Sequence, residues 1–463
     1  MRHRRAGEAG VRKVRGPVRR VCVRAAGLVL VCLTQMVASK TVSAQTVSAQ
    51  TISTGVPVGT RARAVEALFA TLAERDKPYH ATTATVPSAH ARAEEFDRIF
   101  GEDSAGPLDH LLIAIKANID LADVPATAGS KSVRETTAVD APVVARVREA
   151  GGVVVAVTNM DTWARGTATV SQAYGSTGNA WDPDRSPYGS SGGAAVAVAR
   201  GFVDAAIGTD TCGSLRLPAS ANAIYGLRPT AGAVSRSGIV PLSPTQDVVG
   251  PLARNVDVLE RVFAAIRGPE PGDRLTLTAT TAPKRLRTRR VGVLKGFVKP
   301  SASPDSPLVR LARAGIEVVS VKPAGLVPAN VIEDEFDVAL DAWSDGRPYL
   351  DGNLPVRDPP GYRQRLAGRV RLRAALTALL DRNGLDALVY PTTAGPPGAR
   401  GVRQTTANCW IAANSGLPAL AVPGEIVNGF PTIGVDLLGR EFDESTLLDL
   451  ARLLPDAPRP PGV

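Results

Sequence analysis

Two short turns rich in glycine and serine lie close together in this sequence of 463 residues: SPYGSSGG at 186–193 and GTDTCGSLRLPA at 208–219. The first turn leads into the small-residue segment 194–200, which is typical of a helix that packs closely against a sheet, and a mostly apolar run follows at 203–207. Taken alone, the first turn is an ordinary flexible connection in a chain with 44 glycines. The two turns together, on either side of one helix and one strand, are a far more specific signal.

The rest of the body alternates helical and strand patterns. Apolar residues at helical spacing or in short buried runs predict helices at 62–75, 142–150 and 366–383, and strands at 111–115, 153–157, 291–294 and 385–390. With 44% apolar and 21% charged residues the chain is neither disordered nor a membrane bundle. We therefore expect one large α/β domain with a covered sheet.

The first 50 residues have the layout of an export signal. They carry ten basic residues and one acid, which accounts for nine of the ten net positive charges, and an uncharged stretch of fifteen residues lies at 25–39. That stretch is shorter than the roughly 20 residues that a spanning helix needs. The repeat TVSAQ at 41–50 offers cleavage after Ala44 or Ala49. We interpret 1–49 as a cleaved signal, with an uncleaved membrane anchor as the alternative.

The export route and the final compartment follow from the same leader. Arg19 and Arg20 resemble the pair of a twin-arginine signal, but the residues after them do not complete that pattern. The Sec and twin-arginine routes therefore both stay open. In either case we expect a periplasmic or extracellular protein, with membrane contact only if the leader is retained.

The body at 50–463 is close to electrically neutral, so it offers no positive field to hold nucleic acid. The basic run at 284–290 falls in a segment rich in proline, threonine and arginine, 268–290, which we interpret as a solvated, linker-like connection. We therefore expect no nucleic-acid partner, and the oligomeric state has no marker in the sequence.

Cysteine and histidine are scarce in the body. Cys212 and Cys409 are far apart in the sequence, too few for a disulfide framework and without metal-like spacing. His80, His90 and His110 are isolated from one another. We expect no metal and no cofactor, and a Ser-His-Asp hydrolase would have to recruit one of these three histidines.

Lys116 is the candidate base for a serine nucleophile. It follows the apolar strand 111–115 and is flanked by Ile115 and Ala117. An ammonium cannot accept a proton, so a lysine base must be desolvated and surrounded by groups that favour its neutral amine. A lysine that merely caps a strand end is the alternative, but the two serine turns favour the catalytic interpretation.

With these residues in place, the sequence resembles the amidase signature family of Ser-Ser-Lys hydrolases, over roughly 68–454. Besides the two serine turns, the matching motifs are IAIKANI at 113–119, TNMD at 158–161, YGLRPT at 225–230, VPL at 240–242, DVVGP at 247–251, NSGLPA at 414–419 and GREFDE at 439–444. The resemblance implies the fold of that family over residues 50–463, a single large α/β domain whose central mixed, twisted sheet is covered by helices on both faces.

The resemblance also implies a site. Ser214 would be the nucleophile, Lys116 the base and Ser190 the bridging serine, which would follow a cis peptide bond. The backbone N–H groups that would hold the oxyanion belong to Thr211, Cys212, Gly213 and Ser214. The supporting residues would be Ser191, which orients Lys116, Asp210, which fixes the turn, and Arg216, which supports the loop.

Three functions compete on this basis. The first is an exported amidase that hydrolyses a linear carboxylic amide, with a small-molecule or peptide amide as substrate. The second is a weak or inactive relative that acts as a binding protein, because Ala117, Tyr188 and Cys212 depart from the family's usual residues and the pocket segment 301–365 is divergent. The third is an amidotransferase subunit, which the leader disfavours.

Overall fold

The computed structural model describes residues 59–463 except 123, 133–138, 279–287, 298–302, 324, 348, 351–353 and 407. The expected signal at 1–49 and most of the basic run lie outside the described residues. Within the described part, no helix is both long and apolar enough to cross a membrane.

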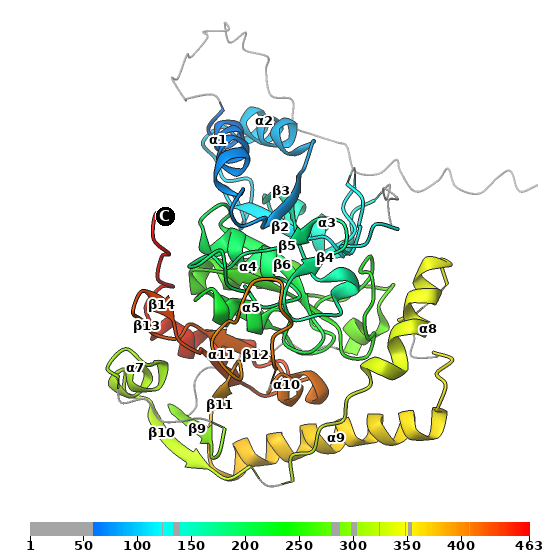
Figure 1. The fold of residues 1–463 in the computed structure, drawn as a ribbon, viewed down its shortest axis with the longest axis vertical. Coiled ribbons are helices and arrows are strands. Elements are labelled where there is room, and N and C mark those ends of the chain that lie inside the picture. The colour runs from blue at the N-terminus through cyan, green and yellow to red at the C-terminus, as the bar shows by residue number, and fades with distance from the viewer. Residues whose placement is uncertain are drawn as a thin grey trace, which may run out of the picture. The chain divides into compact units, whose positions relative to one another are not determined.

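Eleven strands form one mixed sheet in the order β1-β3-β2-β6-β8-β7-β12-β15-β11-β9-β10 (Figure 1). They are β1 (Thr82–Thr85), β2 (Leu112–Lys116), β3 (Val153–Thr158), β6 (Ala205–Asp210), β7 (Tyr225–Arg228), β8 (Val248–Ala253), β9 (Arg290–Leu294), β10 (Glu317–Val321), β11 (Ala387–Pro391), β12 (Ala419–Val422) and β15 (Val435–Leu438). β2 is parallel to β3 and β6, and β9 is parallel to β10 and β11. The successive pairs from β6 to β11 are antiparallel.

The helices cover both faces of this sheet. They are α1 (Thr60–Arg75), α2 (Ala89–Phe100), α3 (Pro142–Glu149), α4 (Gly192–Ala199), α5 (Arg216–Ala221), α6 (Val256–Ile266), α7 (Pro307–Arg313), α8 (Ile332–Ser344), α9 (Pro359–Arg382), α10 (Trp410–Ser415) and α11 (Glu444–Arg452). α4 and α5 contact each other on one face, and α3, α6 and α11 pack together on the other. Every residue of β3, β6 and β8 is buried, as expected of strands covered on both sides. The predicted α/β fold with a mixed, covered sheet is confirmed.

The remaining described elements are short. They are the 3-10 helices η1 (Thr162–Ala164) and η2 (Arg274–Thr278), and two small hairpins, β4 (Val170–Ser171) with β5 (Gly175–Ser176) and β13 (Ile426–Val427) with β14 (Phe430–Pro431).

Small residues let α4 lie close to the sheet. All eight of its residues are buried. A Cβ atom on Gly193 would lie 2.4 Å from the carbonyl oxygen of Ala81 and 2.5 Å from that of Asn159, so only glycine fits there. Because α4 begins immediately after the first serine turn, this close packing also fixes where Ser190 and Ser191 lie.

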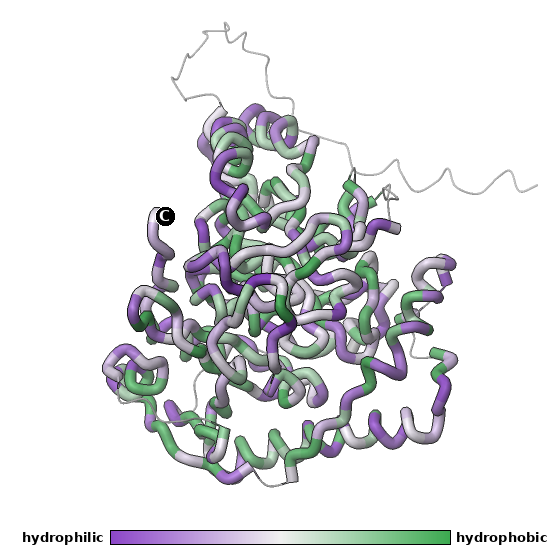
Figure 2. The backbone as a smooth tube through the Cα atoms, in the orientation of Figure 1, coloured by the Kyte–Doolittle hydropathy of each residue, from purple (hydrophilic) through white to green (hydrophobic). Residues whose placement is uncertain are grey.

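The long helix α9 supports the short helix α10, beside which it lies (Figure 1). Figure 2 shows polar and apolar residues interspersed along α9. The buried residues of this helix are Tyr362, Arg369, Leu372, Leu376, Leu379 and Leu380. The guanidinium groups of Arg369 and Arg373 donate to the carbonyl oxygens of Asn414 and Ser415, 3.0 and 2.7 Å away. α9 therefore anchors the carboxyl end of α10.

Candidate active site

The candidate site begins at the carboxyl ends of two parallel neighbours, β2 and β6. Ile115 on β2 pairs with Ile207 on β6. Lys116 follows Ile115 directly and Thr209 comes two residues after Ile207, so both lie at the same edge of the sheet. Lys116 is completely buried. Its Nζ lies 2.8 Å from Ser190 Oγ, 2.8 Å from Thr209 Oγ1 and 3.5 Å from the carbonyl oxygen of Thr209.

Burial favours a neutral amine at Lys116, and the neighbouring oxygens can satisfy that amine. Burial lowers the pKa of Lys116 from 10.5 to about 7, although the carboxylates of Asp161, Asp210 and Asp247 oppose this shift. A neutral amine has two N–H bonds and one lone pair. The carbonyl oxygen of Thr209 can only accept, so the two N–H bonds can point at the two oxygens of Thr209. The lone pair is then left to accept the hydroxyl proton of Ser190.

The backbone of the first serine turn has a cis peptide bond and two hydrogen bonds to other segments. The Gly189–Ser190 peptide bond is cis, as the family resemblance implies. The carbonyl oxygen of Ser190 accepts from the N–H of Asp161 at 3.3 Å, and the N–H of Ser191 donates to the carbonyl oxygen of Ser214 at 3.2 Å. The last bond places the two serine turns directly against each other.

Ser191 reaches Lys116 indirectly. We expected Ser191 to orient Lys116, but its Oγ donates to the carbonyl oxygen of Thr209 at 3.2 Å rather than to the amine. The hydroxyl that contacts the amine is that of Thr209, which also accepts from the side-chain amide of Asn118 at 3.2 Å. Sequence reasoning missed Thr209, because a threonine within an apolar strand has no signal until its neighbours across the sheet are known.

The second serine turn wraps around the carboxylate of Asp210. Its two oxygens accept from the N–H of Gly213 at 2.7 Å and from that of Leu215 at 3.2 Å. Gly213 has φ 94°, a left-handed conformation that glycine adopts without strain. These bonds bring Ser214 back over the sheet, where it is 6% exposed and its Oγ has no hydrogen-bond partner among the described residues. Of the two expected hydroxyl links, the one from Lys116 to Ser190 is therefore formed, and among the described residues the one from Ser190 to Ser214 is not closed by a hydrogen bond.

Two buried arginines hold Asp210 ionised. Arg216 lies 3.1 Å from one carboxylate oxygen of Asp210, and Arg228 lies 2.8 Å from the other. Burial by itself would raise the pKa of Asp210, but the two guanidinium groups outweigh it and hold that pKa well below its ordinary value. Arg216 also pairs with the buried carboxylate of Asp436 on β15. This network joins the serine turn to the far part of the sheet.

The N–H groups of the second turn differ in what they can bind. In the part of the chain that the structure describes, the N–H groups of Thr211, Cys212 and Ser214 donate to no acceptor. The N–H of Gly213 is already bonded to Asp210. The expected four-donor oxyanion site is therefore corrected to three free donors, because Gly213 serves the turn itself.

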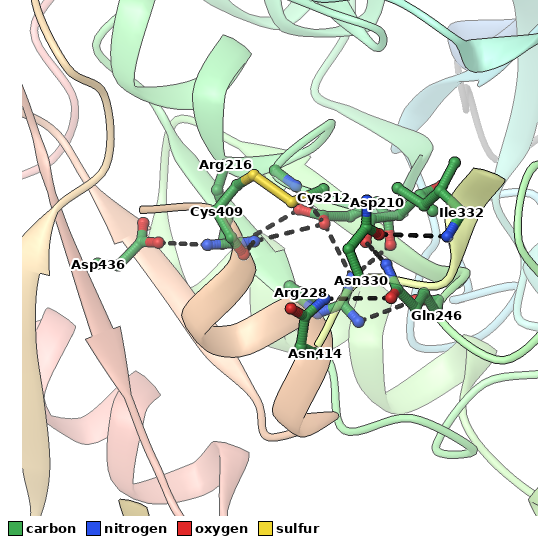
Figure 3. Close-up of a disulfide and its surroundings, with 12 residues drawn as sticks. Asp210, Cys212, Arg216, Arg228, Gln246, Asn330, Ile332, Cys409, Asn414 and Asp436 are labelled. Carbon is green, nitrogen blue, oxygen red and sulfur yellow. Dashed lines mark hydrogen bonds and ion pairs between the residues drawn. A yellow bond between two sulfur atoms is a disulfide. The ribbon is translucent and has the colours of Figure 1, made fainter. Parts of the chain in front are cut away.

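A disulfide joins Cys212 to Cys409, with Cα atoms 5.0 Å apart (Figure 3). Sequence reasoning counted these cysteines as too few for a disulfide framework and did not pair them, and 197 residues separate them. The available signal for this pairing was that residues 50–463 contain two cysteines, Cys212 and Cys409. Cys212 is not among the residues with positive φ, so its backbone needs no glycine.

Tyr188 takes a left-handed conformation immediately before the cis peptide bond, with φ 59°. Its hydroxyl donates to the carbonyl oxygen of Gly395 at 3.0 Å, and its own carbonyl oxygen accepts from Thr169 Oγ1 at 2.7 Å. These bonds fix the unusual backbone at Tyr188 from both ends of the residue.

The histidines of the body take no part in this arrangement. Among the described residues, the hydrogen bonds and ion pairs of His80, His90 and His110 do not reach the lysine or the two serines of the site. Across the described ranges, no three His, Cys, Asp or Glu side chains are grouped as a metal site would require.

A largely apolar cavity of about 890 Å³ borders the loop that follows β11. Its lining includes Thr393 and Gly395, and Gly395 is the residue that accepts the Tyr188 hydroxyl. It also includes Asn408, the neighbour of Cys409. The cavity wall is thus connected to both serine turns.

A buried lysine amine bonded to one serine, with a second serine turn and free N–H groups beside it, is the arrangement expected of an α/β hydrolase in which a lysine would take the place of histidine. The chain belongs to the Amidase family, whose model matches residues 63–334. It is 31% identical to one subunit of the glutamyl-tRNA(Gln) amidotransferase of Methanothermobacter thermautotrophicus over 402 residues, covering 78% of this chain and 88% of that protein. The corresponding subunit from Symbiobacterium thermophilum is 32% identical, covering 79% and 87%.

The solved structures agree with this family membership. The native peptide amidase of Stenotrophomonas maltophilia superposes with a TM-score of 0.73 at 29% identity, covering 85% of this chain and 92% of that one. The chain is therefore an amide-hydrolysing enzyme of the amidase signature family.

Proposed function

We propose that this enzyme is an exported amidase that cleaves a linear carboxylic amide through an acyl-enzyme on Ser214. The observation that carries the proposal is the completely buried Lys116 amine, which lies 2.8 Å from Ser190 Oγ. Ser191, the residue after Ser190, is hydrogen-bonded through its N–H to the carbonyl oxygen of Ser214. The lowered pKa of Lys116, about 7, makes the neutral base available near neutral pH.

The first half of the reaction forms the acyl-enzyme. Lys116 takes the hydroxyl proton of Ser190 while Ser190 takes that of Ser214, whose oxygen bonds to the amide carbonyl carbon. The negative charge on the carbonyl oxygen lies near the free N–H groups of Thr211, Cys212 and Ser214. Each such donor contributes about 3–4 kcal/mol in other hydrolases. The proton then returns through Ser190 to the nitrogen, the C–N bond breaks and the amine leaves.

The second half releases the acid. Water attacks the ester on Ser214 and gives a proton to Lys116 through Ser190. The tetrahedral intermediate collapses, and the proton returns to Ser214 Oγ. Both halves use the same two hydroxyls and the same amine, so no other general base is needed.

The disulfide supports the export proposal. Disulfides persist in the periplasm and outside the cell but are rare in the cytosol of most organisms. The basic and apolar leader provides a second, independent argument from the sequence. Growth of the producing cells, followed by N-terminal sequencing of the mature chain from the periplasm or medium, tests this; an intact N-terminus in the cytosolic fraction would contradict it.

A fluorophosphonate probe tests the catalytic proposal. The mature chain should be labelled at Ser214, and labelling and amide hydrolysis should both be lost in Ser214→Ala. Ser344, an exposed serine at the end of α8, gives the matched control, and Ser344→Ala should be labelled like the unmodified chain. If the unmodified chain is neither labelled nor releases amine across a panel of aliphatic, aryl and peptide amides, it is instead a binding protein that retains the fold.

The curated relatives favour a second candidate, an amidotransferase subunit. Such a subunit depends on its partner chains, whereas an exported amidase acts alone. Turnover of simple or C-terminal peptide amides by the purified single chain supports the amidase. No turnover by the single chain, but amide hydrolysis once the other subunits of a relative's amidotransferase are added, supports the amidotransferase subunit.

A further inference from the structure

The disulfide lies inside the turn that carries the proposed nucleophile. Cys212 is two residues before Ser214. Its own N–H is one of the three N–H groups of this turn that, within the described residues, have no acceptor. A covalent bond to a distant part of the chain at this position constrains the groups that would bind the oxyanion. Any role of the disulfide in catalysis rests on the proposed function of Ser214.

Hydrogen bonds hold the turn on both sides of Cys212 but not at Cys212 itself. Thr211 Oγ1 donates to Asp247 at 2.5 Å, and Asp210 accepts from Gly213 and Leu215. Within the described ranges, neither the N–H nor the carbonyl oxygen of Cys212 has a hydrogen-bond partner. The disulfide is therefore what ties this residue to the rest of the molecule.

The other end of the disulfide is firmly anchored. Cys409 immediately precedes α10, and its carbonyl oxygen accepts from Arg216 at 3.2 Å, while Arg216 also pairs with Asp210 (Figure 3). This closes a ring that runs from Cys212 through Cys409, Arg216 and Asp210 back to the turn. α10 in turn is held by α9.

The start of α10 also lies against the turn without a gap. A Cβ atom on Gly213 would be 3.0 Å from the Cβ of Cys409. Cys409 is 7% exposed and Cys212 is half-buried, so a small reductant can approach the disulfide from the side of Cys212.

We infer that the Cys212–Cys409 disulfide is a positioning element for the oxyanion donors, so that acylation of Ser214 is fast in the oxidised enzyme and slow in the reduced one. A dithiol reductant supplies two electrons and two protons, the S–S bond becomes two thiols, and the dithiol becomes a cyclic disulfide. Cys212 then loses its tie, and its N–H is no longer held in one arrangement, although the hydrogen bonds at Thr211 and Gly213 remain. Loss of a single oxyanion donor lowers kcat by about 10²–10³ in another hydrolase.

The test compares oxidised enzyme, reduced enzyme and the variants Cys409→Ser and Cys212→Ser with Cys409→Ser. Each is assayed for kcat, KM and the rate of fluorophosphonate labelling, at a temperature well below its Tm. We expect kcat and the labelling rate to fall at least tenfold on reduction and in both variants, with KM changed less than threefold. Reoxidation of the reduced enzyme should restore the rate in proportion to the disulfide re-formed, measured by thiol alkylation and mass spectrometry.

The controls separate this inference from the function on which it rests. Reductant should not change the rate of the double variant, which has no disulfide to lose. If the oxidised enzyme is active and the double variant keeps its full kcat and labelling rate while only its Tm falls, the disulfide is merely structural and the inference is wrong. If the oxidised enzyme is itself neither labelled nor active, the proposed function fails instead.

Discussion

Replacing Lys116 with methionine should stabilise the fold near neutral pH while abolishing activity. In the folded chain the pKa of Lys116 is about 7, against an ordinary value of 10.5 in an unfolded one. At about 1.4 kcal/mol per pH unit, this difference corresponds to about 5 kcal/mol. Below pH 7 both states hold the proton, and the folded state carries the full cost of a buried ammonium.

The sign of the pH dependence follows from proton binding. Between pH 7 and 10.5 the unfolded chain binds one more proton at this position than the folded chain, so the stability of the unmodified protein rises with pH. A methionine of similar length removes the titrating group, along with hydrogen bonds to Ser190 and Thr209 that are worth about 1 kcal/mol each. The variant Lys116→Met is therefore expected to be the more stable protein at pH 7 and to lose that advantage as pH rises.

Urea unfolding of both proteins from pH 6 to pH 10 measures this difference directly, because other groups titrate alike in the two proteins. The free energy of unfolding of the unmodified protein minus that of Lys116→Met should rise by about 4 kcal/mol between pH 7 and pH 10. A difference that stays constant over this range would refute the reasoning, since it would mean that Lys116 keeps an ordinary pKa in the fold.

Two further predictions concern the neighbours of Lys116. Asp210→Asn removes the buried carboxylate that Arg216 and Arg228 share and should lower the free energy of unfolding by about 3–5 kcal/mol; a loss below 1 kcal/mol in urea unfolding would contradict that network's importance. Thr209→Val removes a hydroxyl that accepts from the Lys116 amine, which favours its charged form. The variant should lower kcat and shift the acidic limb of the kcat/KM–pH profile to lower pH, and an unshifted limb would argue against this contact.

The apolar parts of the fold were readable from the sequence. The runs at 111–115 and 153–157 became β2 and β3 within a residue or two, because uninterrupted apolar residues suit strands covered on both faces. The run at 203–207 became β6 two to three residues later, at Ala205–Asp210. That strand continues through polar Thr209 and Asp210, which tertiary partners satisfy.

The helix predicted at 366–383 begins earlier, at Pro359. The Asp358 side chain accepts from the N–H of Gly361, and a proline occupies the first turn, both of which are ordinary helix-start signals. The weak amphipathic pattern before 366 concealed this start, so the capping residues were the better guide there.

In the candidate site, too, some residues could be proposed from the sequence and others could not. Lys116, Ser190 and Ser214 were proposed from the sequence because scarce histidine and two serine turns restrict the available chemistry, and the family resemblance then assigned their expected roles; the structure brings Lys116 to 2.8 Å from Ser190 Oγ. Thr209, the disulfide and the occupied N–H of Gly213 were missed. Each depends on which residues lie opposite one another in space, and a single sequence carries no record of such pairings.

The acylation rate of Ser214 as a function of pH tests the central claim most directly. With a fluorophosphonate in excess, the labelling rate of the unmodified chain should rise as pH increases, with a midpoint near the Lys116 pKa of about 7, and level off above it. The same rate in Lys116→Met should be lower by orders of magnitude and show no such midpoint. Equal labelling of the two proteins across the range would contradict a proton transfer from Ser214 through Ser190 to Lys116.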